Sequence, residues 1–222
     1  MREINLLENN KSVKEKRALL FINGEPPEKL PVFESYDLIA CSDGAFHYLK
    51  SLGFPLKKLD FISGDFDSHS GNDALIYQEK FIYTPDQDKT DFEKSLEILK
   101  QKGAATVDVY GGSGGEMDHF LGNISVAFSF INRMEIRFYD EFSTYYFIPK
   151  FISLKGVKNK MISLYPFPAA ERITTAGLHW PLHADDLSIT SRIGTRNFAS
   201  EDEVTIEYES GNLLIFIGKQ YL

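Results

Sequence analysis

The feature that most constrains the fold of this chain is a repeated order of short apolar runs, each followed at once by a polar cluster. The clearest runs are residues 59–62, 80–83 and 106–110, and residues 18–22 and 36–41 have the same character. Short apolar runs bounded by turn signals are typical of strands that are buried on both faces of a parallel sheet. This order therefore predicts an α/β fold in the first part of the chain.

Amphipathic segments between these runs are the expected crossover helices. We expect helices over residues 45–49 and 90–102, and from near 118 to about 131. The second is the clearest, because Thr90 and Glu93 match a capping box and apolar residues recur behind them at helical spacing. Strand, turn and helix in repeated order predict a doubly wound, mostly parallel sheet.

The second part of the chain has a different pattern. After Asp140, strand-like runs follow one another with no convincing long helix between them. Short strands at close spacing favour an antiparallel β-sandwich or barrel. We therefore expect an α/β domain over residues 1–141 and a β-sandwich domain over residues 142–222. The expected strands are residues 143–148, 161–165, 171–175, 187–190, 204–209 and 212–217, with a tight hairpin turn at 210–212 between the last two.

Composition excludes some classes of function. The chain has 222 residues, 43% of them hydrophobic, which is enough for a sizeable core. Its net charge of −8 and the lack of a basic face argue against a nucleic-acid partner. The single cysteine, Cys41, excludes an internal disulfide and makes a reducing cytoplasm the simplest setting. The start is not signal-like and no run reaches membrane-spanning length, so we expect a soluble cytoplasmic protein with no membrane partner.

Three polar clusters at the ends of predicted strands carry the chemistry. The first contains Asp65 and Asp67, the second spans residues 84–91, and the third is the glycine-rich stretch at 111–119. Ligands of open α/β sheets bind beyond the carboxyl ends of the strands, so we expect the clusters to meet at one edge. Crowded carboxylates repel unless a cation lies among them, and Mg²⁺ prefers such oxygen ligands while it bridges phosphates. The pattern indicates a metal-bound phosphate substrate.

Each of these residues also has a purely structural interpretation. Asp65 and Asp67 alone would indicate a solvated turn, and Asp91 alone would complement the dipole of the helix that it starts. Neither interpretation explains three crowded clusters. Glycines at 111–115 let backbone N–H groups approach phosphate oxygens, whereas a sharp turn needs fewer of them. Asp118 either caps the following helix or accepts a hydrogen bond from a ribose or substrate group.

The only tryptophan, Trp180, lies in the second part of the chain. On its own evidence, core packing is the better interpretation of this side chain. The functional alternative is a stacking surface for an aromatic or cationic ligand.

Taken together, four ordered motifs resemble those of the thiamine pyrophosphokinase family. Gly-Asp-Phe-Asp-Ser stands at 64–68 and Asp-Gln-Asp-Lys-Thr-Asp-Phe at 86–92. Gly-Gly-x-Gly-Gly-x-x-Asp-His stands at 111–119, and Thr-Thr-x-Gly-Leu-x-Trp-Pro-Leu at 174–182 falls in the expected β domain. The resemblance runs from about residue 18 to the C-terminus, nearly the whole chain.

The resemblance implies an enzyme, a thiamine diphosphokinase that uses Mg²⁺ and works as a homodimer with active sites between the subunits. Its reaction transfers the pyrophosphate of ATP to the hydroxyl of thiamine and gives thiamine diphosphate and AMP. The residues implied for catalysis and for the metal are Asp65, Asp67 and Asp91, and the base is either Asp67 or Asp91. Those implied for ATP are Asp43, Gly44, Asp88, Lys89, Thr90, Gly111, Gly112, Gly114, Gly115, Asp118 and His119. Those implied for thiamine are Gln87, Thr174, Gly177, Leu178, Trp180 and Asn197.

Three positions depart from the family pattern. Glu116 stands where the family has an arginine or a lysine-like residue, so Lys89 is the expected replacement for that phosphate contact. Asp-Gly-Gly-Ala-Asn becomes Asp-Gly-Ala-Phe-His at 43–47, and the family's Ser-Asn becomes Arg196-Asn197. Two other functions stay open: a pyrophosphokinase for another alcohol, such as a pterin, and a sensor of nucleotide or thiamine without turnover.

Overall fold

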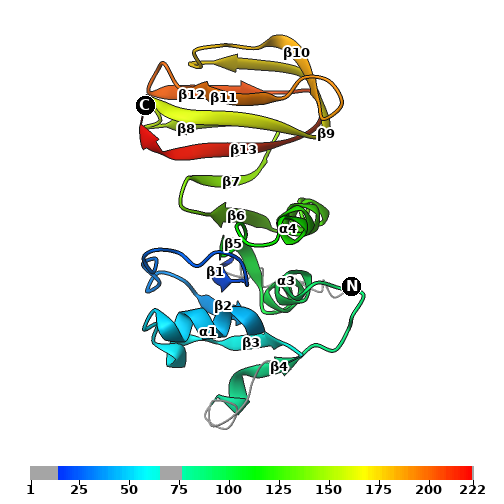
Figure 1. Cartoon of the computed structure of the whole chain (residues 1–222). Coiled ribbons are helices and arrows are strands. Elements are labelled where there is room, and N and C mark those ends of the chain that lie inside the picture. The colour runs from blue at the N-terminus through cyan, green and yellow to red at the C-terminus, as the bar shows by residue number, and fades with distance from the viewer. Residues whose placement is uncertain (1–14, 66–76, 222) are drawn as a thin grey trace, which may run out of the picture.

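The computed structural model describes residues 15–65 and 77–221 of the chain. Figure 1 shows an α/β part and, stacked on it, a part made of strands only. The parallel strands of the first part have the order β4-β3-β2-β1-β5-β6. They are β1 (Lys16–Phe21), β2 (Leu38–Ser42), β3 (Phe61–Gly64), β4 (Phe81–Tyr83), β5 (Ala104–Tyr110) and β6 (Glu135–Tyr139).

Helices cover both faces of this parallel sheet. Helix α1 (Asp43–Ser51) packs on one face, whereas α3 (Asp91–Gln101) and α4 (Met117–Ser129) pack on the other. Alternate residues of β1 show the two layers, because Leu20 belongs to the core with α3 and α4, and Leu19 and Phe21 belong to the core with α1. The predicted doubly wound sheet is therefore confirmed. Two short 3₁₀ turns, η1 (Leu56–Lys58) and η2 (Gln78–Lys80), precede β3 and β4.

The second part is antiparallel and is built around one long strand. Along one edge β9 pairs with β13 and then with β12, and along the other edge it pairs with β11 and then with β10. These strands enclose a separate apolar core that includes Ile162, Ile173, Leu187 and Val204. The predicted antiparallel β class of this part is confirmed. Its strands are β7 (Ser143–Ile148), β8 (Phe151–Lys155), β9 (Lys160–Ala176), β10 (His183–Ser188), β11 (Gly194–Phe198), β12 (Glu203–Glu207) and β13 (Ser210–Tyr221).

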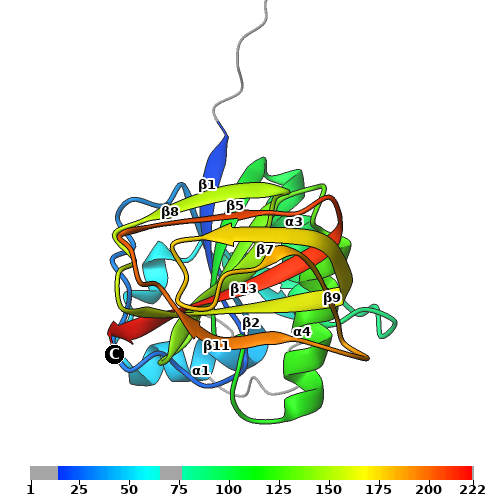
Figure 2. The ribbon, with the colours of Figure 1, turned by 90° about the horizontal axis from the view of Figure 1, so that it is seen from above.

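The two parts share one continuous sheet. Strand β6 pairs with β7 in antiparallel fashion, with Phe138 opposite Tyr145. These two rings stack 5.0 Å apart, and Tyr145 stacks in turn on Phe216 of β13 at 5.1 Å. All three rings belong to or pack against the core beneath α3 and α4. Figure 2, which looks down on the β part, shows its strands lying over the helices of the α/β part.

Two predictions for the β part are wrong. Residues 161–165 and 171–175 are pieces of the single strand β9, which continues through Pro166 and Pro168. The hairpin at 210–212 does not form, because β12 and β13 follow one another along the same edge of β9, with Thr205 opposite Ala176 and Ser210 opposite Glu171. Strands β6, β8 and β11 have no counterpart among the predicted elements.

Within residues 15–65 and 77–221, no helix combines the length and the apolar character that crossing a membrane requires.

Candidate active site

The carboxyl ends of the parallel strands open into a cavity of about 520 Å³. Its walls come from the turns that follow β1, β2, β3 and β5, and from the first turns of α3 and α4. This is the sheet edge at which ligands of doubly wound folds bind. Twelve of the predicted site residues line the cavity: Gly44, Asp65, Gln87, Lys89, Thr90, Asp91, Gly111, Gly112, Gly114, Gly115, Asp118 and His119.

Two of the three predicted metal ligands lie at this cavity. Asp65, which follows β3, and Asp91, which begins α3, line the same cavity although they are far apart in the sequence. Asp67 lies outside the described residues. Two residues implied for ATP do not line the cavity. Asp43 is 5% exposed at the start of α1, and the backbone N–H of Asp88 donates to Asp86 Oδ1 at 2.9 Å.

A buried lysine that the sequence analysis did not name organises the acidic side of the cavity. Lys94 lines the cavity, is 7% exposed, and its Nζ lies 2.8 Å from Asp91 Oδ1. The same ammonium donates to the backbone oxygens of Thr84 at 2.9 Å and Asp86 at 3.1 Å. It therefore offsets the charge of Asp91 and ties the preceding segment to α3. Its spacing of one helical turn from Asp91 is the signal that could have identified it.

The start of α3 forms as the capping pattern predicts. Thr90 is the N-cap residue, and its Oγ1 accepts a hydrogen bond from the backbone N–H of Glu93 at 3.2 Å. Lys89 also lines the cavity, but its Nζ lies 2.7 Å from Glu97 Oε1. The hydrogen bond to Glu97 raises the pKa of Lys89. The cation expected to replace the missing family contact is therefore already paired with a carboxylate.

The glycine-rich loop packs tightly against the turn that follows β1. Gly111 has a φ of 78°, and a Cβ there would lie 2.0 Å from the backbone oxygen of Ile22. A Cβ on Gly24 would lie 2.3 Å from the backbone oxygen of Gly111. Both positions therefore require glycine for close approach of the two turns. Gly24 and its neighbour Asn23 also line the cavity and were not predicted.

Three exposed side chains gather at the start of α4. Ligand atoms of Glu116, Asp118 and His119 lie within 4.8 Å of one another. His119 Nε2 is 3.6 Å from Glu116 Oε2, and Asp118 Oδ1 accepts from the backbone N–H of His119 at 2.9 Å. Glu116 is the N-cap residue of α4, but its side chain makes no capping hydrogen bond. Glu116 lines the cavity at the position where the family pattern has a cation.

Of the residues implied for thiamine, only Gln87 lines this cavity, and the others lie in the β part and do not line it. Trp180 is 57% exposed, so the interpretation as a core residue is wrong. Asn197 fixes its backbone, because Asn197 Oδ1 accepts from the Trp180 N–H at 3.1 Å and Asn197 Nδ2 donates to the Trp180 oxygen at 2.7 Å. The rings of His179 and Phe198 meet Trp180 edge-on at 4.6 and 5.5 Å. The segment thus presents a supported, exposed aromatic surface.

The other residues of this group have structural surroundings. Leu178 is 6% exposed and belongs to the core of the β part. Thr174 Oγ1 accepts from the backbone N–H of Ala184 at 3.2 Å. Gly177 has a φ of 81°, and a Cβ there would lie 2.2 Å from the backbone oxygen of Glu203. Leu178 and Gly177 therefore shape the segment that carries Trp180.

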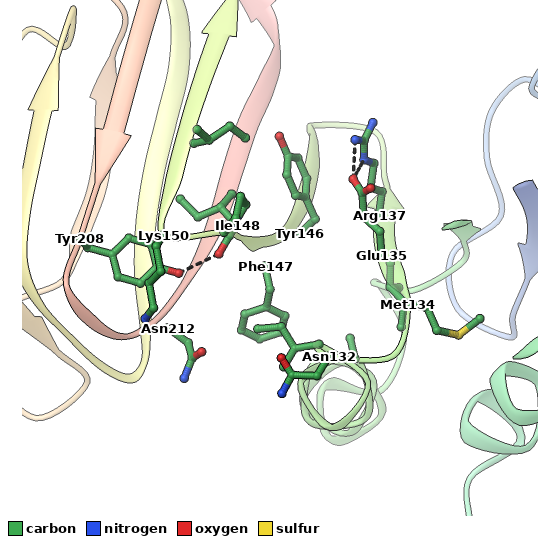
Figure 3. A pocket seen from close by; sticks show the side chains of 15 residues that line it. Asn132, Met134, Glu135, Arg137, Tyr146, Phe147, Ile148, Lys150, Tyr208 and Asn212 are labelled. Atoms are coloured by element: carbon green, nitrogen blue, oxygen red, sulfur yellow. Dashed lines mark hydrogen bonds and ion pairs between the residues drawn. The ribbon is translucent and has the colours of Figure 1, made fainter. Parts of the chain in front are cut away.

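A second cavity of about 650 Å³ lies where β6 and β7 separate (Figure 3). Several of its polar side chains already have partners within the protein. Arg137 Nε donates to Glu135 Oε1 at 2.6 Å, and the hydroxyl of Tyr208 donates to the backbone oxygen of Ile148 at 2.7 Å. Lys150 lies 4.3 Å from the centre of the Tyr208 ring. None of the predicted site residues that the structure describes lines this cavity.

A doubly wound α/β unit with acids and glycines at its strand ends, continuous with an antiparallel β unit, defines a two-part protein of the α/β class whose ligands bind at the strand ends. Two family models match the chain. The one described as "Thiamin pyrophosphokinase, catalytic domain" matches residues 31–139, and "Thiamin pyrophosphokinase, vitamin B1 binding domain" matches residues 151–213. The chain therefore belongs to the thiamin pyrophosphokinase family, as the four motifs predicted, and the prediction of a diphosphokinase enzyme is confirmed at the level of the family.

Relatives and solved structures agree with this assignment. The thiamine pyrophosphokinase of Bacillus subtilis is 24% identical over 160 residues, which cover 68% of this chain and 75% of that protein. Thiamine pyrophosphokinase 1 of Oryza sativa is 30% identical over 174 residues, which cover 69% of this chain and 64% of the relative. The crystal structure of the Bacillus subtilis protein superimposes with a TM-score of 0.78 at 22% identity, over 92% of this chain and all of that one. The Candida albicans thiamin pyrophosphokinase superimposes with a TM-score of 0.77 at 18% identity, over 92% of this chain and 89% of that one.

Proposed function

We propose that this enzyme transfers the pyrophosphate of ATP to the hydroxyl group of thiamine and gives thiamine diphosphate and AMP. The observation that carries the proposal is that Asp65 and Asp91 line one cavity together with the glycine-rich loop. The names of the relatives support thiamine as the acceptor. The exposed Trp180 supports it as well, because an aromatic face attracts the positive charge of the thiazolium ring.

The donor set in the cavity fits a divalent cation. Asp65 and Asp91 offer carboxylate oxygens, which are the ligands that Mg²⁺ prefers. We propose that they hold Mg²⁺ together with Asp67. When bound, Mg²⁺ neutralises charge on the phosphate oxygens. Lys94, which lies 2.8 Å from Asp91 Oδ1, keeps that carboxylate in place for this role.

The remaining work of the protein is positioning. The backbone N–H groups of the loop at 111–115, with Thr90, hold the phosphate chain of ATP so that its β-phosphorus faces the thiamine hydroxyl. The hydroxyl oxygen forms a bond to the β-phosphorus, and the bond from that phosphorus to the oxygen that leaves with AMP breaks. The hydroxyl proton passes to the carboxylate of Asp67 or Asp91. A cavity that excludes water favours transfer to thiamine over hydrolysis of ATP.

The thiamine site needs a second copy of the chain in this proposal. Trp180, Thr174 and Asn197 line no part of the cavity that contains Asp65, so within one chain the two groups do not share a pocket. We propose a homodimer in which the β part of one subunit covers the cavity of the other, with Gln87 reaching thiamine across the interface. Met117 and Leu121 of α4 are 63% and 64% exposed at the edge of the cavity-lining turn, which supports a covering partner.

The remaining predictions about organisation stay part of the proposal. We propose a catalytic unit over residues 1–141 and a thiamine-binding unit over residues 142–222. The boundary near Glu141 lies in the turn between the paired strands β6 and β7. We also propose that the enzyme works in the cytoplasm.

A direct assay tests the function. The purified chain is incubated with ATP, Mg²⁺ and thiamine, and AMP and thiamine diphosphate are quantified together. We expect equal amounts of both products, and no product when the metal is chelated. Binding of ATP and thiamine without AMP would instead identify a sensor. Turnover with a pterin alcohol but not with thiamine would identify a different pyrophosphokinase.

A further inference from the structure

Buried serine side chains lie beneath the cavity, between the sheet and the first turn of α3. Ser42 of β2 and Ser63 of β3 are direct neighbours in the parallel register, so their side chains point to the same face of the sheet. That face is the one covered by α3, because Ser63 Oγ lies 2.7 Å from Ser95 Oγ of that helix. Ser95 in turn donates to the backbone oxygen of Asp91 at 2.6 Å. Ser63 and Ser95 are thus tied into a chain that ends at a proposed metal ligand.

Ser42 differs from the other two serines in both bonding and position. It is 2% exposed, yet its hydroxyl has no hydrogen-bond partner among the described residues. It also lines the cavity, whereas Ser63 and Ser95 are absent from the described cavity wall. A buried hydroxyl without a partner is costly, so its presence at a ligand cavity needs an explanation.

We propose that Ser42 is a positioning residue for the nucleotide, whose hydroxyl donates a hydrogen bond to a phosphate oxygen of ATP. This rests on the proposed function, which places the phosphate chain in this cavity. The hydroxyl is covered in the structure, and in this proposal a change of χ1 to another staggered rotamer brings it to the phosphate when the nucleotide binds. That rotation breaks no hydrogen bond seen among the described residues, unlike the same rotation at Ser63. Phosphate oxygens are charged acceptors and form the stronger class of hydrogen bond.

Two matched variants separate this role from packing. Ser42→Ala removes a hydroxyl that has no partner among the described residues, so thermal stability should stay equal or rise. The KM for ATP should rise about ten-fold. The KM for thiamine should stay within about two-fold. Ser63→Ala removes the hydroxyl that is bonded to Ser95, so it should lower the melting temperature and leave the KM for ATP within about two-fold.

The outcomes are distinct. An unchanged KM for ATP in Ser42→Ala would overturn the proposal and indicate that the hydroxyl is satisfied by water alone. An equal rise of this KM in both variants would overturn it in favour of general packing. If the wild-type chain makes no AMP, the proposed function fails. The inference about Ser42 is then decided by a binding measurement, the rise in melting temperature when a nonhydrolysable ATP analogue and Mg²⁺ are added. A smaller rise in melting temperature in Ser42→Ala than in both wild type and Ser63→Ala would support the role of Ser42. Equal rises in all three proteins, or no rise in wild type, would overturn it.

Discussion

The carboxylate of Asp91 is fixed by the buried ammonium of Lys94 at 2.8 Å, whereas Glu93, the other acid of the first turn of α3, is half-buried and does not line the cavity. Replacing Asp91 by asparagine keeps the size of the side chain and removes the charge that the proposed Mg²⁺ needs. Asp91→Asn should therefore keep the fold and abolish Mg²⁺-dependent AMP formation. AMP release and circular dichroism measure the two effects.

Glu93→Gln is the matched control, because it removes a charge from the same turn at a residue that does not line the cavity. It should keep wild-type turnover. Undiminished AMP formation in Asp91→Asn would rule this residue out as a metal ligand.

Trp180 is held by its backbone to Asn197 and presents a ring that is 57% exposed. Loss of this ring should weaken thiamine binding through the lost contact with the thiazolium, by about 1 kcal/mol or more. Trp180→Ala should raise the KM for thiamine by five-fold or more, on the order expected from that energy, and leave the KM for ATP nearly unchanged. Trp180→Phe should retain most of the affinity. A parallel rise of both constants in steady-state kinetics would indicate a packing role.

The order of the parallel strands decides which site residues could be predicted from the sequence. Acids and glycines at the ends of neighbouring parallel strands must share one sheet edge, so the meeting of Asp65, Asp91 and the loop at 111–115 was predictable. Lys94 and Ser42 were not predicted. The i, i+3 spacing of Lys94 from Asp91 could have indicated that pair. The burial of Lys94 and Ser42 at the cavity depends on the angle at which α3 packs on the sheet, and sequence spacing does not determine this angle.

Among the elements, α3 presents its N-terminal turn to the cavity and depends on its cap. Thr90 Oγ1 accepts from the Glu93 N–H at 3.2 Å, so Thr90→Ala leaves this N–H without that acceptor. The free energy of unfolding should fall by about 1 kcal/mol. Urea denaturation should show a lower midpoint with an unchanged slope, and Thr90→Ser should recover most of the loss. A wild-type midpoint in Thr90→Ala would show that the hydroxyl contributes nothing to the helix.

The predicted elements were most accurate where apolar runs are buried on both faces, as in β1, β2 and β5. Strand β6 was missed because the charged residues Glu135 and Arg137 alternate with its apolar ones. Strand β9 was divided in two because Pro166 and Pro168 are turn signals. Its pairing with strands on both edges carries it through these prolines, and such long-range pairing is not readable from a local pattern.

For the whole molecule, buried tyrosines predict how stability depends on alkaline pH. Burial, with smaller contributions from Tyr139 and Asp108, raises the pKa of Tyr110 to about 12. Burial also raises the pKa values of Tyr36, Tyr48 and Tyr145. A tyrosine in the unfolded chain loses its proton near a pKa of about 10. The contribution of these protonated, buried tyrosines to the free energy of unfolding is therefore fully present below about pH 10. It is lost as the pH rises from there toward the pKa that each tyrosine has in the folded protein.

The free energy of unfolding, measured by urea titration from pH 8 to 11, should stay flat at first and then decline. Tyr110→Phe should decline less steeply than wild type, because one of the linked protons is gone. Lysines also titrate in this range, so the difference between the two proteins is the informative quantity. Identical slopes would contradict the linkage.

The central claim is that Asp65 and Asp91 share one divalent cation beside the phosphate chain of a nucleotide. Anomalous diffraction from a crystal grown with Mn²⁺ and a nonhydrolysable ATP analogue tests it most directly, since Mn²⁺ takes the same oxygen ligands as Mg²⁺. We expect an anomalous peak within ligand distance of both carboxylates and of the phosphate oxygens. A nucleotide bound in the cavity with no peak there, or a peak that contacts neither aspartate, would contradict the claim.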